Sequence, residues 1–150
     1  MPYGNEDSIY NVFGQVMRFH YCRMHMLLEK LGVYPGQPPL LFALGKNEGL
    51  SQKELAQKLY LKAATITVML NRMESAGLIE RRPDGNDQRV SRVYLTGAGK
   101  KVLSDVKETL KNIELECFSN FTPEEQLLLR RLFMQMRDNL MAACGENFEE

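Results

Sequence analysis

The spacing of apolar residues changes at Gly77, and this change restricts the folds open to the chain. Before Gly77, apolar side chains recur at the spacing that is typical of amphipathic helices. After it, two stretches with strand-like alternation, LIERR (78–82) and VSRVYL (90–95), flank the turn-rich segment PDGNDQ. This pattern predicts a two-stranded β-hairpin directly after a helix that ends at Gly77.

Two short helices are predicted just before the hairpin. In the segment SQKELAQKLY, Ser51 can cap a helix and Glu54 completes a capping box. The loop that follows, around Tyr60 to Lys62, holds only about three or four residues, which is typical of a helix-turn-helix. The residues expected to point inward from the second helix are Ile66, Met69, Leu70 and Met73.

Longer helices are predicted on both sides of this unit. Apolar residues recur at helical spacing from Ser8 to Leu31, where Gly32 ends the pattern, and residues 39–49 predict a short buried helix. Two long helices follow the hairpin, GAGKKVLSDVKETLKNIELECF and TPEEQLLLRRLFMQMRDNLM. Their expected apolar stripes are Val102, Val106, Leu110, Ile113 and Cys117 in the first, and Leu128, Leu132, Met136 and Leu140 in the second.

These outer helices predict a homodimer. A helix-turn-helix with a hairpin is complete without the segments before Leu40 and after Gly97, so their apolar seams must be buried against something else. A second copy of the chain is the simplest partner. Two-fold symmetry would present two recognition helices to half-sites about one helical turn apart, which implies a pseudo-palindromic DNA site.

The formal net charge is zero, but the charges are unevenly distributed. Residues 58–101 carry nine Lys and Arg against four Asp and Glu, whereas residues 102–150 carry five against ten. A polyanion responds to the local field, so the basic middle of the chain favours binding to double-stranded DNA.

A helix-turn-helix presents its second helix to the major groove. We therefore expect Lys62 at the entrance to the groove, with Ser51, at the start of the first helix, as a further candidate contact. The outward face of the second helix holds no acidic residue, and its small side chains permit close approach. The candidate contacts on this face are Ala64, Thr65, Thr67, Val68, Asn71 and Arg72.

The hairpin supplies a second set of candidate contacts. Its turn should project Arg89, a side chain that a narrow A·T-rich minor groove attracts. Asp87 could hold the guanidinium of Arg89 through a bidentate pair. Arg81, Arg82 and Arg92 are expected to lie along the adjacent phosphates.

The segment AGLIERRPDGNDQRVSRVYLTGAG resembles the wing of the multiple-antibiotic-resistance regulator (MarR) family, with the pattern G-L-[IV]-x-R, D-x-x-D-x-R and L-T-x-x-G. The segments LGVYPGQPPLLFAL, LSQKELAQKL and TITVMLNRMESAGLI match the family's preceding segments in order. The resemblance therefore covers nearly the whole chain. It implies a winged-helix homodimer in which the terminal helices interlock and the two wings straddle an operator.

The resemblance also implies roles for individual residues. Thr65, Thr67 and Asn71 would face the groove, Asp87 would support the wing, and Arg89 would be the wing-tip arginine. The sequence departs from the family at one of these helix positions, since Val68 stands where a basic or polar residue is common.

Taken together, these features predict a mainly α (α+β) fold, a winged helix-turn-helix with long N- and C-terminal dimerisation helices. One domain spans residues 1–150, with a DNA-binding lobe at 40–97 and dimerisation helices at 1–39 and 98–150. The predicted function is that of a ligand-responsive transcriptional repressor. The alternative is an effector-binding or protein-interaction module that keeps the fold and has weak or lost DNA binding.

Other features favour neither catalysis nor a cofactor. The chain has no GxSxG, P-loop or HExxH motif, and His20, Cys22 and His25 point in different directions on a helix, so we expect no metal site. Cys22 is expected to be a buried, inert thiol. Tyr34 and Arg23 are possible members of a pocket for a small aromatic or lipophilic effector, although a packed core is the simpler interpretation.

The same sequence predicts a cytoplasmic protein that does not enter a membrane. It contains neither a signal peptide at MPYGNEDSIY nor an apolar run long enough to span a bilayer. Its three cysteines have no CxxC spacing, which fits a reducing compartment.

Overall fold

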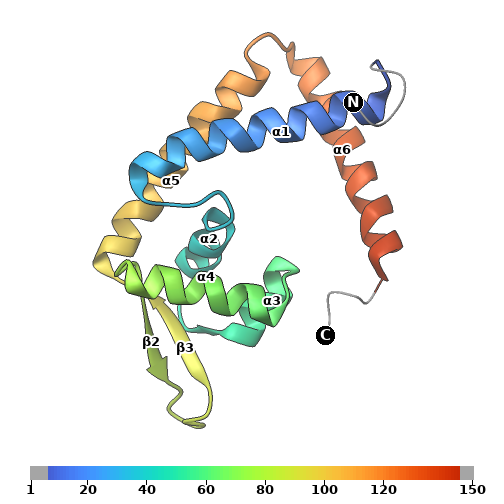
Figure 1. Cartoon of the computed structure of the whole chain (residues 1–150). Coiled ribbons are helices and arrows are strands. Elements are labelled where there is room, and N and C mark those ends of the chain that lie inside the picture. Colours follow the sequence, from blue (N-terminus) through green and yellow to red (C-terminus); the bar gives the residue numbers. More distant parts are fainter. Residues whose placement is uncertain (1–6, 146–150) are drawn as a thin grey trace.

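The computed structural model describes residues 7–145, and these fold in the predicted order of elements (Figure 1). Six α-helices, one short 3₁₀-helix and three strands make up this part of the chain. They are α1 (Ile9–Leu28), η1 (Glu29–Leu31), α2 (Pro38–Lys46), β1 (Leu50–Ser51), α3 (Gln52–Leu59), α4 (Ala63–Ser75), β2 (Ile79–Pro83), β3 (Ser91–Leu95), α5 (Gly97–Phe118) and α6 (Pro123–Cys144).

The helix-turn-helix is confirmed, and so is the cap that begins it. The Ser51 hydroxyl accepts a hydrogen bond from the Glu54 backbone amide at 3.2 Å, and the Ser51 amide donates to the Glu54 carboxylate at 2.7 Å. Two orphan amides are thereby satisfied at the start of α3. α3 ends at Tyr60, which adopts the left-handed conformation with φ 53°, and α4 begins two residues after Leu61.

The hairpin is also confirmed, but the sheet contains a third strand that the sequence pattern did not predict. β3 lies in the centre, antiparallel to both β2 and β1. β1 has only two residues, with Leu50 opposite Val93 and Ser51 opposite Arg92. A strand of two residues is too short to show alternation in sequence. Its second residue, Ser51, is also the cap of α3.

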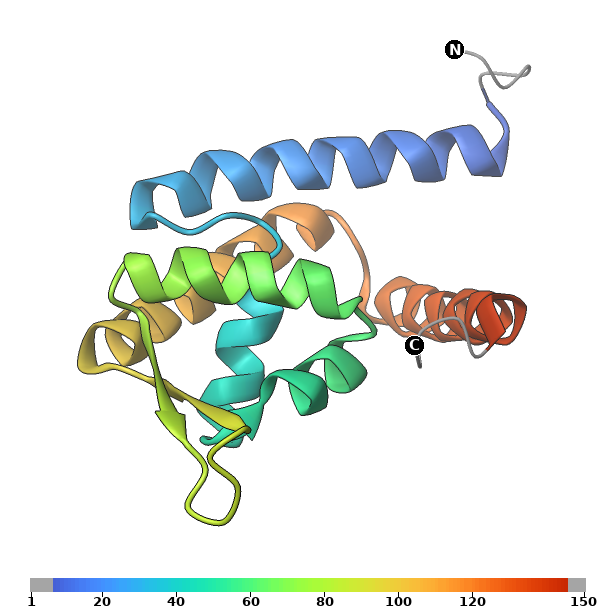
Figure 2. The same ribbon diagram turned by 60° about the horizontal axis from the view of Figure 1, so that its bottom comes forward.

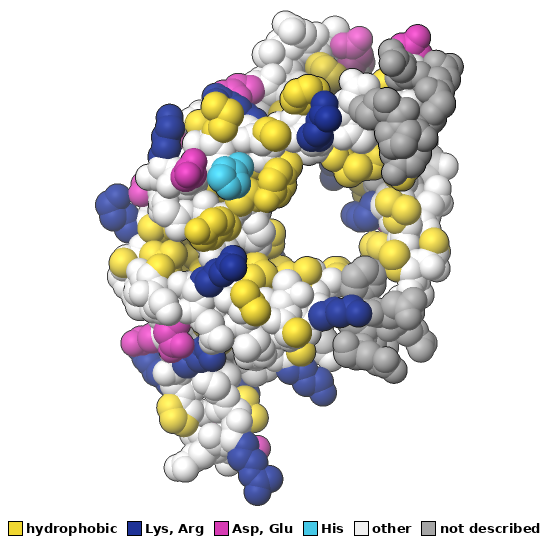
Figure 3. Space-filling view, in the orientation of Figure 1, with side chains coloured by type: hydrophobic (Ala, Val, Ile, Leu, Met, Phe, Trp, Pro, Cys, Tyr) yellow, Lys and Arg dark blue, Asp and Glu magenta, His cyan; other side chains and the backbone are white. Residues whose placement is uncertain are grey.

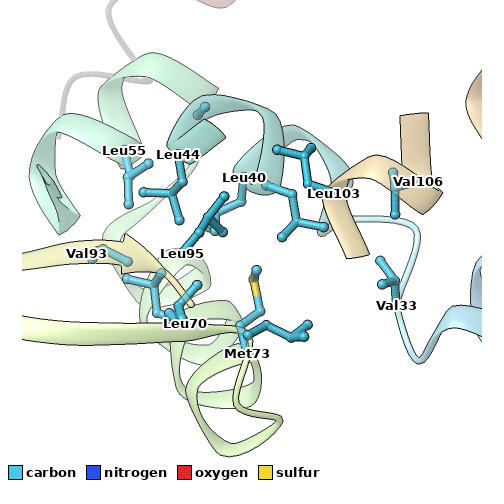
Figure 4. Packing of buried hydrophobic residues seen from close by; sticks show 14 of the residues in the cluster. Val33, Leu40, Leu44, Leu55, Leu70, Met73, Val93, Leu95, Leu103 and Val106 are labelled. Atoms are coloured by element: carbon cyan, nitrogen blue, oxygen red, sulfur yellow. The ribbon is translucent and has the colours of Figure 1, made fainter. Parts of the chain in front are cut away.

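One hydrophobic core joins the end of α1, α2, the helix-turn-helix, the sheet and α5 as far as Ile113. Figure 4 shows side chains from α2, α3, α4, β3 and α5 converging on it. Gly99 permits the close approach of α5, since a Cβ atom at this position would lie 1.9 Å from the Leu78 carbonyl oxygen. The fully buried large side chains are Leu28, Leu40, Leu41, Leu44, Leu55, Ile66, Leu70, Met73, Ile79, Val93 and Val106.

Two expectations about burial were wrong, and both concern cysteines. The predicted stripe on α5 holds at Val102, Val106, Leu110 and Ile113, but Cys117 is exposed, and the buried Leu103 was not predicted. Cys22 is exposed rather than buried, since α1 turns only one side to the core, through Met24 and Leu28.

The outer helices leave much apolar surface uncovered. α6 runs away from the core, and Figures 1 and 3 show an opening between it and the helix-turn-helix. Every residue of α6 is described, and none is buried. In the predicted seam, Leu128, Leu132 and Leu140 are 52%, 44% and 56% exposed. The N-terminal part of α1 is similarly exposed at Ile9 and Phe19.

Within residues 7–145, none of the helices has both the length and the apolar character needed to cross a bilayer.

Candidate nucleic-acid interface

The outer face of α4 is oriented as the sequence predicted. Ile66, Leu70 and Met73 are buried, which turns the opposite side of the helix to the surface. Ala64, Thr65, Val68, Asn71 and Arg72 are all exposed, and Lys62 is the exposed N-cap residue. Small side chains at the first turns leave room for a groove edge to approach the helix backbone.

Thr67 differs from this pattern because it is half-buried and already hydrogen bonded. Its hydroxyl donates to the Ala63 carbonyl at 2.9 Å and accepts a hydrogen bond from the side-chain amide of Gln52. Thr67 therefore links α3 to α4, and its hydroxyl proton is not free to read a base. Gln52 was not predicted as a residue of this site, because a polar residue at the first position of a helix shows no pattern that indicates a contact with the next helix.

Asn71 is exposed, but a wing arginine fixes one of its atoms. The Arg81 guanidinium donates to the Asn71 Oδ1 at 2.6 Å, and the Arg81 Nε lies 3.5 Å from the Glu74 carboxylate. Because a guanidinium only donates, the Asn71 atom in contact must be the oxygen. The two N–H donors of Asn71 remain for a base acceptor or a phosphate. Arg81 itself joins α4 to β2 rather than extending towards phosphates.

Tyr34 and Arg23, the two residues suggested for an effector pocket, contact different partners. The Arg72 guanidinium lies 5.6 Å from the centroid of the Tyr34 ring, a cation–π contact between α4 and the loop after η1. Arg23 instead forms a bidentate pair with Glu116, at 2.8 and 2.6 Å, which joins α1 to α5. This hydrogen-bonded pair raises the pKa of Arg23 and lowers that of Glu116.

Backbone hydrogen bonds define the tip of the wing. The Asp84 amide donates to the Val90 carbonyl at 2.8 Å, and the Val90 amide donates to the Asp87 carbonyl at 2.9 Å. The Asp87 carboxylate accepts from the Arg89 backbone amide at 3.0 Å. The expected pair between Asp87 and the Arg89 guanidinium is therefore wrong. A carboxylate two residues before an amide closes a local turn with it, which leaves the guanidinium free.

The Arg89 side chain forms neither a hydrogen bond nor an ion pair with any residue in the range 7–145. It is exposed in the turn between β2 and β3, which projects from the body of the molecule (Figure 2). A cation in this position is available to a partner.

Arg82 is partly neutralised but still accessible. It pairs with Glu80 on its own strand and lies 4.5 Å from the centroid of the Tyr94 ring on β3. Its side chain remains 60% exposed. A phosphate can compete for such a guanidinium, because exposed ion pairs are weak.

Arg92 is not available for phosphates in the way that the sequence suggested. Its guanidinium donates to the Asp84 carboxylate at 2.8 Å, to the Glu54 carboxylate at 2.9 Å and to the Gly49 carbonyl at 3.2 Å, and a second guanidinium nitrogen forms an ion pair with Asp84 at 2.7 Å. Two of these partners are distant in sequence, since Glu54 is 38 positions and Gly49 is 43 positions from Arg92. No local pattern in the sequence indicates such contacts.

Both carboxylates in this cluster titrate below their ordinary range. A hydrogen bond from the Asn86 backbone amide, followed by the Arg92 guanidinium, lowers the pKa of Asp84. The backbone amide and hydroxyl of Ser51 lower the pKa of Glu54, and Arg92 adds to the effect. The contacts to Arg92 are therefore present above the ordinary carboxylate range and are lost as the pH falls through the lowered values.

The described residues bring no group of three potential metal ligands together. His25 packs against the Tyr21 ring, with 6.4 Å between the ring centroids.

Comparison with known proteins places this geometry in a family. Residues 31–90 match a family model described as "MarR family". The transcriptional regulator HosA of Escherichia coli O127:H6 is 32% identical over 100 residues, covering 67% of this chain and 74% of HosA. The transcriptional repressor MdtR of Bacillus subtilis is 34% identical over 100 residues, covering 67% of this chain and 64% of MdtR, so the match spans about two thirds of that relative.

Solved structures show a similar fold. The crystal structure of the S. aureus MepR–DNA complex superposes with a TM-score of 0.80 at 22% identity, covering 92% of this chain and all of the MepR chain. At this identity, the likeness establishes the winged helix-turn-helix fold.

Proposed function

Because this chain belongs to the MarR family of transcription regulators, we propose that it represses transcription by binding a pseudo-palindromic operator as a homodimer. The observation that carries the proposal is the free Arg89 guanidinium at the tip of a wing that follows an exposed α4 face. In the proposed complex, α4 enters the major groove and Arg89 the adjacent minor groove. The proposed repression takes place in the cytoplasm and requires no catalytic residue.

The operator should be rich in A·T pairs. Ala64 and Val68 are exposed on α4 and offer methyl groups rather than hydrogen-bond donors, which favours thymine methyls over guanine edges. Selection from a pool of random duplexes should therefore enrich two A·T-rich half-sites related by a two-fold axis. Val68→Arg, which supplies a donor at the same position, should shift the selected half-sites towards guanine. Half-sites dominated by G·C pairs in the wild-type selection would contradict this reading of the helix face.

A small aromatic or lipophilic effector is the proposed signal. An apolar cavity of about 780 Å³ lies between α1, the end of α3 and α6, a size within the usual range for small-molecule sites. Phe13, Tyr60 and Phe133 line it beside Leu140 of the α6 seam, so the cavity borders the proposed dimer interface, and Arg137 provides a cation for an acidic ligand. Because the cavity contacts both the helix-turn-helix and an outer helix, a ligand there can favour one spacing of the two lobes.

Addition of an effector should weaken operator binding by about 5- to 150-fold, the usual range of allosteric coupling. The measurement is a titration of fluorescent operator in the presence of phenolic acids and lipophilic compounds. Phe13→Trp, which reduces the cavity, serves as the matched variant and should lose the response while retaining operator binding. If every compound leaves operator affinity unchanged, the protein is a constitutive repressor or responds to a different signal.

The alternative function is an effector-binding or protein-interaction module on the same fold with weak or lost DNA binding. Ala64 and Val68 favour it, because neither can donate to a base. The duplex selection separates the two proposals: a module without DNA binding enriches no sequence, whatever ligand is present.

A further inference from the structure

Arg92 lies where the wing meets the helix-turn-helix. It is on the central strand β3, opposite Arg82 of β2 on one side and Ser51 of β1 on the other. Two arginines directly opposite each other repel. Acidic groups close to Arg92 are therefore needed to offset this repulsion.

The partners of Arg92 belong to separate segments of the chain. Asp84, the residue after β2, accepts a hydrogen bond from the Arg92 Nε at 2.8 Å, and the same carboxylate oxygen lies 2.7 Å from the Arg92 Nη2 in an ion pair. On the other side, the Arg92 Nη1 donates to Glu54 in the first turn of α3 and to the carbonyl of Gly49, which precedes β1. One side chain on β3 thus contacts the residue after β2, the residue before β1 and the first helix of the helix-turn-helix.

The acceptors are themselves fixed in place. The second oxygen of Asp84 accepts the Asn86 amide at 2.9 Å, so the carboxylate is bound to the turn of the wing. Glu54 is part of the capping box with Ser51, so its carboxylate is bound to the start of α3. The side chains of Arg92 and Asp84 are 32% and 16% exposed, which limits competition by water at this end. The guanidinium therefore joins two rigid points.

We propose that Arg92 is a positioning residue, which fixes the wing relative to α3 and thereby allows Arg89 and the outer face of α4 to contact one DNA duplex together. This inference rests on the proposed DNA-binding function. It assigns Arg92 a role different from a phosphate contact, although both roles involve a positive charge on the wing. The planar guanidinium is required because it directs N–H groups to three acceptors at once, which an ammonium group on a flexible stem does not reproduce.

The test compares Arg92→Gln with Arg89→Gln, since both remove one positive charge from the same hairpin. Operator affinity is measured over a series of salt concentrations. Arg92→Gln should weaken binding roughly tenfold, in the range expected for residues that share one network. The slope of log K against log salt should not change, because the loosened wing must be ordered on binding but Arg89 still makes its contact in the complex. Arg89→Gln should reduce that slope, because it removes a group that displaces counterions from DNA. A reduced slope for Arg92→Gln would make Arg92 a phosphate contact and overturn the proposal.

Arg92→Lys separates geometry from charge. It keeps the net charge and should bind the operator as weakly as Arg92→Gln, because the lysine cannot reach Asp84, Glu54 and Gly49 together. Recovery of wild-type affinity in Arg92→Lys would show that charge alone matters and would contradict a positioning role.

Amide hydrogen exchange in the free protein tests the same role without DNA. The Gly49 amide donates to Val93 at 2.9 Å and the Asp84 amide donates to Val90 at 2.8 Å, so the two amides report on either side of β3. Both should exchange faster in Arg92→Gln and at the wild-type rate in Arg89→Gln. Unchanged exchange at both amides would overturn the proposal. If the wild-type protein bound no duplex, the DNA-binding function would fail, while this measurement would still decide whether Arg92 holds the wing.

Discussion

Leu132→Glu should convert the protein into a folded monomer that binds its operator about 10²- to 10⁴-fold more weakly, since linked half-sites lose that much when they act separately. Leu132 lies in the middle of the α6 seam and is 44% exposed, so a glutamate there is tolerated by one protomer but not by an apolar interface. Light scattering measures the mass, and titration of a two-half-site operator measures the affinity.

Leu132→Met is the matched control, because it keeps the size and apolar character of the side chain and should remain dimeric. The circular dichroism spectrum of Leu132→Glu should match that of the wild type, since α6 contributes no buried residue within a described protomer. A dimeric Leu132→Glu protein, or a wild-type protein that is monomeric at micromolar concentration, would exclude these helices as the dimer interface.

The reason to expect this interface is the amount of apolar surface that one protomer leaves in water. α6 is 22 residues long, and it begins with a capping box between Thr122 and Glu125, so its start is well defined. Its leucines nevertheless have no core to enter within residues 7–145. α1 presents further exposed apolar residues at its N-terminal part. Such surfaces mark association sites when they are contiguous.

Most of the fold could be predicted because local signals determine it. Ser51 caps a helix as expected, Ser8 and Thr122 cap two others, and the left-handed glycines Gly32 and Gly77 follow the ends of η1 and α4. These signals act over three or four residues, so they are readable in one sequence. The β1 strand was missed for the opposite reason, since it exists only through its pairing with β3, in which Leu50 lies opposite Val93, 43 residues later in the sequence.

The positions of the site residues could be predicted from the sequence, but the hydrogen bonds of their side chains could not. The sequence identified which residues of α4 and the wing would be exposed, and the structure places Ala64, Thr65 and Val68 there. It did not indicate that Thr67, Asn71 and Arg92 are already bound to other side chains. Side-chain partners are set by the packing of distant elements, and a list of arginines on one strand cannot separate a DNA contact from an internal ion pair.

This distinction leaves Arg89 as the wing residue whose loss should change both the affinity for DNA and the preference for a sequence. Arg89→Ala removes an exposed guanidinium that has no hydrogen-bond or ion-pair partner among residues 7–145, so folding should be unaffected. Operator affinity should fall, and the slope of log K against log salt should decrease by about 0.9 for each wing, or roughly 1.8 for the dimer. The preference for a narrow A·T-rich segment beside each half-site should be lost at the same time.

Two further variants show which property of Arg89 matters. Arg82→Ala also removes an exposed charge, but from the strand rather than the tip, and should weaken operator and scrambled duplexes alike. Asp87→Ala should reproduce part of the Arg89→Ala effect, because the Asp87 carboxylate holds the Arg89 backbone amide and so orients the tip. Titrations of both duplexes at several salt concentrations distinguish these effects. If Arg89→Ala binds the operator with wild-type affinity and slope, the hairpin does not read DNA, and a protein-interaction module becomes the better account of this chain.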